Sequence, residues 1–354
     1  MKVSSNLINI LFRLGAIFLA LIFTTLILIA AGAPPLTAYQ NIIIGAFESK
    51  QDIANVLVAW VPLMLVTSGL LITFSAGLWN IGVEGQITLG AIFTTGLLRI
   101  FQDSTFPPFL IMLLAMVAGI IGGAVWASLV GFLKTYGGVN EIFGGLGLNF
   151  VSTALTLWLI FGPWKRPGTG SMSGTEPFPQ EIWLPQFTGL RLSPWSIIIA
   201  LIGLAVVYSI LQNTYFGLRL KAVGKNKKAA FLLGIPTNLY LILAFVLCGA
   251  LAGFAGSLQV LGVYHRLIPS ISSGYGYLGL LIAMLTNYHA LWTLPVTFFF
   301  ASLNIGSIQL PIVLKLDSAL SGVLQGALVL FVLMMDGVRQ RFNDRFGQKK
   351  EKTG

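Results

Sequence analysis

The sequence predicts an all-α integral membrane protein, and both its composition and the arrangement of its apolar residues support that prediction. Of 354 residues, 56% are hydrophobic and only 9% are charged, whereas about a quarter of the residues in a soluble domain are charged. The apolar residues are gathered into runs, and many runs approach the ~20 residues that a helix needs to cross the hydrocarbon core. We therefore expect residues 1–354 to form a single transmembrane domain.

Ten apolar runs are predicted to be transmembrane helices. The third and eighth runs are short and the fifth is rich in glycine, so about eight to eleven spans agree with the sequence. In the first run, Lys2 and Arg13 precede the main apolar stretch, as in a signal peptide. Its apolar core of about 18 residues exceeds the usual length in signal peptides, so we expect an uncleaved span. The ten runs cover residues 10–31, 53–75, 87–101, 107–132, 142–162, 194–213, 237–263, 276–289, 291–309 and 318–338.

The basic residues predict the orientation, because Lys and Arg are retained on the cytoplasmic side. With ten spans and both termini cytoplasmic, 14 of the 21 Lys and Arg residues fall inside the cell. Three segments then lie outside the membrane: an extracytoplasmic loop at 163–193, a basic cytoplasmic loop at 214–236 and a charged cytoplasmic tail at 339–354. The second to fifth and seventh to tenth spans enter from opposite sides, which is the pattern of an inverted repeat.

The composition also argues against several classes of function. The net charge is +10, but the basic residues are scattered between apolar runs, which favours contact with anionic lipid headgroups over nucleic acid. The single cysteine, Cys248, argues against a disulfide framework or a cysteine metal cluster, and we expect it to be a small core residue. With only two histidines, no HExxH motif and no paired acids, we expect no catalytic residues and no metal site.

Residues 77–86, GLWNIGVEGQ, place Asn80, Glu84 and Gln86 among three glycines at the end of an apolar run. A charged side chain at the bilayer centre costs about 2.5 kcal/mol or more, so at that depth it must face protein or a water-filled cavity. One interpretation is a broken helix in the bundle interior, with these side chains at the translocation pathway or bracing the break. The other is a cytoplasmic turn in which Glu84 is solvated and Asn80 caps a helix. The residue chemistry leaves both open.

A second polar cluster lies at 137–150, GGVNEIFGGLGLNF, where the fifth span begins. Asn140 and Glu141 are suited to capping that helix, because an acidic group near a helix N-terminus is favourable. The alternative is that they line a pathway. Asn149 lies two turns deeper, so we expect it to bond to a neighbouring helix or to face the pathway.

The basic loop contains a predicted short helix, NKKAAFLLGIP, which begins near Asn226 as a cap and ends before Pro236. Its apolar surface is expected to come from Ala229, Ala230, Leu232 and Leu233. Lys227 and Lys228 lie at the positive end of this helix, which is unfavourable for the helix itself. A negative external partner, either lipid headgroups or a protein surface, explains them better. An exposed apolar face also requires a burial partner.

Four stretches resemble the permease subunits of ATP-binding cassette (ABC) importers in the branched-chain amino acid, simple sugar and nucleoside group. They are GLWNIGVEGQITLGA, GGVNEI followed by LN, GLRLKAVGKNKKAAFLLGI and CGALAGFAGSLQVLG. The sequence is most similar to nucleoside permeases that work with basic-membrane-protein-type lipoproteins. It departs from many relatives at 142–147, IFGGLG, and at 286–290, TNYHA, which lacks an arginine.

The resemblance implies a pathway for a small polar solute, with nucleosides favoured over sugars, in the cell membrane of a prokaryote. It implies a second permease subunit, a cytoplasmic ABC ATPase and an extracytoplasmic substrate-binding lipoprotein as partners, and no nucleic acid. This chain is expected to bind no cofactor, since it lacks the GxxxxGK[ST] phosphate loop and the partner ATPase would use the ATP. The residues implied in ATPase coupling are Gly217, Arg219, Ala222, Gly224, Asn226, Ala229, Ala230 and Gly234.

One alternative function also fits the predicted architecture. An ion-coupled secondary transporter could use the same inverted repeat, with Glu84 and Glu141 as proton or sodium groups. That interpretation leaves the basic cytoplasmic loop without an explanation. ATP-independent uptake that follows the membrane potential would support it.

Overall fold

The computed structural model describes residues 5–168, 174–286 and 288–315, with twelve further residues between 322 and 338. The predicted tail at 339–354 and part of the predicted span at 318–338 lie outside these residues. The described residues contain helices and no strand. The helices are α1 (Ser5–Ala30), α2 (Pro35–Phe47), α3 (Lys50–Ser75), α4 (Val83–Phe101), α5 (Pro108–Thr135), α6 (Glu141–Phe161), η1 (Gln180–Ile182), α7 (Pro194–Asn213), α8 (Tyr215–Lys225), α9 (Lys227–Leu232), α10 (Thr237–Gln259), η2 (Val260–Tyr264), α11 (Tyr275–Leu285), α12 (Ala290–Gly306) and α13 (Gln309–Leu314).

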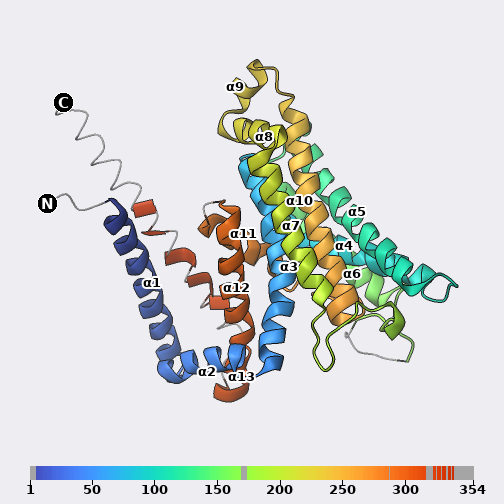
Figure 1. The fold of residues 1–354 in the computed structure, drawn as a ribbon, viewed down its shortest axis with the longest axis horizontal. Coiled ribbons are helices and arrows are strands. Elements are labelled where there is room, and N and C mark those ends of the chain that lie inside the picture. The colour runs from blue at the N-terminus through green and yellow to red at the C-terminus, as the bar shows by residue number, and fades with distance from the viewer. Residues whose placement is uncertain are drawn as a thin grey trace. The chain divides into compact units, whose positions relative to one another are not determined.

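The chain divides into two compact units (Figure 1). Unit 1 comprises residues 1–56 and 299–354. In it, residues 18–30 and 35–47 form a helix pair bent by 108°. The predicted spans include no helix at 35–47, because this segment is shorter than a span and contains Thr, Gln and Asn. A small cluster of buried residues holds the bend: Leu28, Ala33, Ala38, Ile42 and Leu310.

Unit 2, residues 57–298, contains the larger core and every residue singled out in the polar clusters and the basic loop. Within it, each α3 residue from Val61 to Phe74 is buried. Helices α4, α5 and α10 approach one another closely at small residues, and a Cβ atom added to Gly90 would overlap the backbone of Gly253. Glycine therefore allows the backbones of α4 and α10 to touch, as is common between helices in membranes.

The all-α membrane class is confirmed, but the count of ten spans is not. Six helical segments are long and apolar enough to cross a membrane, or seven if the bent pair is one span. They include α3, α5, α6 and α7, which match predicted spans within a few residues. Helix α4 begins at Val83, four residues before its predicted start, and so includes Glu84 in its first turn. Helix α11 has only 11 residues. The inverted repeat remains a prediction.

Helices α8 and α9 lie at one end of unit 2, and residues 174–193, which lead into α7, lie at the opposite end (Figure 1). Which side of the membrane each loop faces stays a prediction. The turn between α3 and α4 lies at the same end as α8. A Cβ atom added to Gly77 in this turn would lie only 3.0 Å from the carbonyl oxygen of Gly224 in α8. The same turn leads directly into the polar cluster of α4.

Candidate functional site

Glu84 is held at the start of α11. The Gly274 N–H donates to Glu84 Oε1 at 3.0 Å, and the Gly276 N–H donates to Oε2 at 2.7 Å. These amides belong to the first turn of α11, where helix geometry leaves donors without intrahelical partners. The carboxylate therefore caps a helix far away in the chain, and the interpretation of Glu84 as a solvated turn residue is wrong.

Asn80 and Gln86 form a reciprocal amide pair. Asn80 Nδ2 donates to Gln86 Oε1 at 3.0 Å, and Gln86 Nε2 donates to Asn80 Oδ1 at 2.9 Å. Asn80 Nδ2 also donates to Cys248 Sγ at 3.1 Å, and all three side chains are buried. The prediction that Cys248 is a small core residue is confirmed. Asn80 does not cap α4, because the N-cap residue is Gly82 and no side chain makes a cap hydrogen bond there.

Asn149 joins α6 to the start of α4 and to α11. Its Oδ1 accepts from the Gly85 N–H at 2.9 Å, and its Nδ2 donates to the Ile81 carbonyl at 2.9 Å. The same Nδ2 lies 3.3 Å from the Tyr277 hydroxyl oxygen. The expected bond to a neighbouring helix is confirmed. A side chain at position 85 would collide with Asn149, since a Cβ there would lie 2.9 Å from Oδ1.

Asn140 and Glu141 serve the junction of α5 and α6. The Ile142 N–H donates to Asn140 Oδ1 at 2.8 Å, so the predicted cap of α6 is confirmed. The Glu141 carboxylate forms an ion pair with Lys134 at the end of α5. Eight residues separate Glu141 from Asn149, which is about 12 Å along a helix. Glu141 is therefore not part of the cluster of Asn80, Glu84, Gln86 and Asn149, which is called the Glu84 cluster below.

The geometry favours a structural use of both carboxylates over ion binding. Glu84 already accepts two backbone hydrogen bonds, and Glu141 already faces Lys134. Among the residues that the structure describes, no group of three or more His, Cys, Asp and Glu side chains could hold a metal ion. The sequence interpretation missed Gly274, Gly276 and Tyr277, although the segment SSGYGY at 272–277 interrupts an apolar region with small and hydroxyl residues.

The basic loop folds into α8 and α9, each with a polar cap. Thr214 Oγ1 accepts from the Gly217 N–H at 3.1 Å and caps α8. Asn226 Oδ1 accepts from the Ala229 N–H at 3.0 Å and caps α9, as predicted. The chain then turns at Gly234, whose φ of +78° favours glycine, before Pro236.

The predicted coupling residues divide into packed and exposed positions. Ala230 is 2% exposed, and Cβ atoms added to Gly217 and Gly224 would overlap the carbonyls of Ile210 and Ser75. The prediction that Ala230 contributes to an open apolar surface is therefore wrong, because its methyl group packs inside the chain. Of the remaining predicted residues, Ala222 is partly buried, and the exposed ones are Arg219, Asn226, Ala229 and Gly234.

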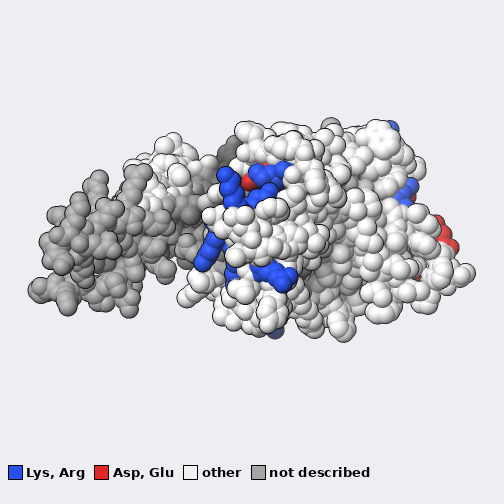
Figure 2. Space-filling model, turned by 90° about the horizontal axis from the view of Figure 1, so that it is seen from above, with Lys and Arg blue, Asp and Glu red and all other residues white. Residues whose placement is uncertain are grey.

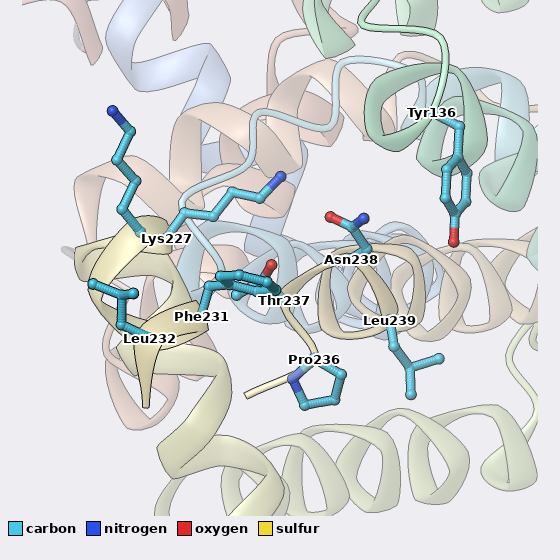
Figure 3. Close-up of a pocket in the computed structure, with 9 residues that line it drawn as sticks. Tyr136, Lys227, Phe231, Leu232, Pro236, Thr237, Asn238 and Leu239 are labelled. Atoms are coloured by element: carbon cyan, nitrogen blue, oxygen red, sulfur yellow. The ribbon is translucent and has the colours of Figure 1, made fainter. Parts of the chain in front are cut away.

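The open apolar surface consists of Phe231, Leu232 and Leu233, which are 67%, 84% and 80% exposed. Phe231 was missing from the predicted surface. Figure 3 shows Phe231 and Leu232 on one side of an open depression, with Tyr136, the residue after α5, on the other. The depression has a volume of about 870 Å³. It is lined by Tyr136, Lys227, Lys228, Phe231, Leu232, Pro236, Thr237, Asn238 and Leu239.

Lysine and arginine side chains gather on the same end of unit 2 (Figure 2). The cations of α8 and α9 are Arg219, Lys221, Lys225, Lys227 and Lys228. Lys221 Nζ donates to Gln212 Oε1 at 3.1 Å. An apolar strip flanked by cations is the composition of a docking surface for a partner with acidic and apolar groups.

Comparison with known proteins gives a consistent result. The family model described as branched-chain amino acid transport system / permease component matches residues 52–333. The glucose ABC transporter permease protein TsgB13 of Haloferax volcanii is 29% identical, over 86% of this chain and 82% of that protein. The nucleoside ABC transporter permease protein NupB of Lactococcus lactis is 27% identical, over 84% of each. The guanosine ABC transporter permease protein NupP of Bacillus subtilis is 25% identical, over 94% of this chain and 96% of that protein.

Proposed function

The chain belongs to the family of branched-chain amino acid transport system permease components, and we propose that it imports nucleosides across the cell membrane of a prokaryote. It is a multi-pass membrane protein and a permease component of an ABC transporter. Relatives named for nucleosides and guanosine support the proposed solute, and the relative named for glucose makes a sugar the second candidate.

The apolar strip Phe231, Leu232 and Leu233, together with the cations beside it, is named the α8–α9 surface here, and it is the observation that carries the proposed assembly. We propose that a cytoplasmic ABC ATPase covers Phe231, Leu232 and Leu233, hydrolyses the ATP and transmits its closure through α8. The exposed fractions of these side chains support this role, because such a patch at a basic end calls for a protein partner. The packing of Gly224 against the end of α3 gives the motion a route into the membrane. We also propose that both termini are cytoplasmic, as the distribution of Lys and Arg in the sequence predicts.

The other proposed partners follow from the same assembly. A second permease subunit would complete the pathway, and an extracytoplasmic lipoprotein would deliver the solute. This chain would bind no cofactor and would perform no hydrolysis, since its sequence lacks a phosphate loop. Anionic lipids remain the alternative partner for the cations of α8 and α9.

A transport assay with the complete assembly tests the proposal. This chain is co-expressed with the proposed second permease subunit, the ATPase and the binding protein. The complex is then reconstituted in liposomes, and uptake of radiolabelled guanosine, uridine or glucose is measured. We expect nucleoside uptake that requires ATP and the binding protein and that persists when ionophores abolish the membrane potential. Glucose uptake without nucleoside uptake would replace the proposed solute. Uptake that needs an ion gradient and no ATP would contradict the ABC assignment.

A further inference from the structure

The chain loses its helical structure between α10 and α11. Helix α10 continues as the π-helix η2 to Tyr264, and residues 265–274 are then non-helical, with bends and turns, until α11 begins at Tyr275. The start of α11 lies deep in unit 2, since Tyr277 reaches Asn149, eight residues into α6. Non-helical backbone at membrane depth is tolerated only where it is buried in protein or lines a water-filled cavity.

The interrupted segment presents polar side chains on a surface that is open within unit 2. Tyr277 is 44% exposed and Ser270 is also exposed. The Tyr264 hydroxyl lies 3.2 Å from Ser273 Oγ, and both residues are partly exposed. Glu84, partly exposed as well, lies beside them against Gly274. Exposing so many polar groups to the hydrocarbon core would cost free energy, so this surface faces water or another protein.

We infer that Tyr264, Ser270, Ser273 and Tyr277 form the solute-contacting surface of the translocation pathway. This inference rests on the proposed transport function and adds the residues that select the solute. All four side chains are polar and uncharged. The Glu84 carboxylate and the N-terminus of α11 compensate each other, so neither offers a free charge to a solute.

The chemistry of these side chains defines the solute class. Hydroxyl groups both donate and accept hydrogen bonds, so they match the hydroxyls of a ribose or hexose. A tyrosine ring adds a flat apolar face, which suits a nucleobase. The surface therefore suits a solute that carries several hydroxyl groups and a planar ring, as a nucleoside does.

Cysteine labelling tests the inference directly, because Cys248 is the only cysteine and is buried. Ser270→Cys and Tyr277→Cys are introduced and the complete transporter in liposomes is treated with a charged methanethiosulfonate reagent. Val206→Cys is the matched control, since Val206 is 49% exposed on α7 beside Ile202, which is 56% exposed. We expect labelling about tenfold or more faster at 270 and 277 than at 206, because a charged reagent is costly to place in hydrocarbon. Guanosine should slow the labelling at 270 and 277.

The outcomes separate this inference from the proposed function. Labelling at 270 and 277 as slow as at 206, with ATP-driven uptake intact, would show a surface covered by lipid or by the second permease and would overturn the inference. Fast labelling that glucose slows and guanosine does not would support the pathway surface and overturn its assigned solute class. As a second readout, Tyr277→Phe should leave KM for guanosine nearly unchanged and Tyr277→Ala should raise it, since only the second removes the ring. Equal KM values in both variants would exclude ring stacking.

Discussion

The Glu84 cluster and the α8–α9 surface lie in the same unit of the molecule but differ in the polarity of their side chains and in their exposure. In the cluster, Glu84, Asn80 and Asn149 are polar side chains in an apolar body, and each has hydrogen-bond partners within the chain. On the α8–α9 surface, Leu232 and Leu233 are apolar side chains at a charged end, and they are 84% and 80% exposed. The cluster is therefore complete within the chain, whereas the surface requires an external partner.

The contact between Gly77 and Gly224 joins these two regions. The backbone of α8 approaches the turn that leads from α3 into the cluster so closely that neither position has room for a side chain. A displacement of α8 by a bound partner would thus press on the turn that carries Asn80. We expect substitutions in the cluster to change stability and transport together, and substitutions on the surface to change partner binding alone.

The largest expected effect is that of Glu84→Ala, which leaves the Gly274 and Gly276 amides without acceptors. A hydrogen bond to a charged group contributes about 1.5–3 kcal/mol, so we expect uptake to fall by about tenfold or more. The measurement is ATP-driven solute uptake at equal protein level in the membrane. Glu84→Gln should retain more activity, since its amide oxygen still accepts one bond. Wild-type uptake in Glu84→Ala would show that the start of α11 needs no cap.

A smaller effect should distinguish Asn149 on α6 from Asn140, the N-cap residue of the same helix. Asn149→Ala removes the acceptor of the Gly85 N–H and leaves the Ile81 carbonyl unpaired, which should cost about 1–3 kcal/mol of stability. Asn140→Ala removes only a helix cap at an exposed position and should cost about 1 kcal/mol. Thermal unfolding of both variants in the same detergent compares them. A larger loss for Asn140→Ala would contradict the view that the interior cluster holds α4 and α6 together.

The smallest effect concerns His265, which follows η2 and stacks on Trp183 of the 163–193 loop with ring centroids 3.6 Å apart. Burial, with a contribution from Arg191, lowers the pKa of His265 from 6.5 to about 4. Because the folded-state pKa is depressed, the stabilisation is present above the unfolded pKa and is lost as pH falls from about 6.5 towards 4. The unfolding temperature of wild type, measured relative to that of His265→Phe, should therefore decrease as pH falls across that range. If the two curves of unfolding temperature against pH are parallel, His265 is not the source of the pH dependence of stability.

Features that depend on neighbouring residues in the sequence were predicted correctly, whereas features that depend on residues far apart in the sequence were not. Continuous apolar runs placed α5 and α7 within a few residues, and local patterns identified the caps Asn140 and Asn226. The start of α11 could not be predicted from local sequence, because its Gly274 N–H donates to Glu84, which lies 190 residues away in the chain. The role of Asn80 depends on Cys248, 168 residues distant. Which face of α9 is open depends on how α9 packs on its neighbours, so Ala230 was misplaced and Phe231 was missed.

Co-purification of the partner ATPase tests the central claim most directly, with Leu232→Asp set against Ala230→Glu. Leu232 is exposed and should tolerate aspartate without loss of thermal stability, whereas Ala230 is buried and its substitution should destabilise the loop. Gly224→Asp should behave like Ala230→Glu. Leu218→Asp is the control for a charge on α8 outside the depression, since Leu218 is 65% exposed.

We expect Leu232→Asp to insert normally and to reduce ATPase recovery by about tenfold or more, because burying a leucine side chain contributes about 1.5–3 kcal/mol. Leu218→Asp should recover the ATPase as wild type does. Full recovery of the ATPase by a stable Leu232→Asp variant, with normal uptake, would show that the apolar strip of α9 is not where the ATPase binds.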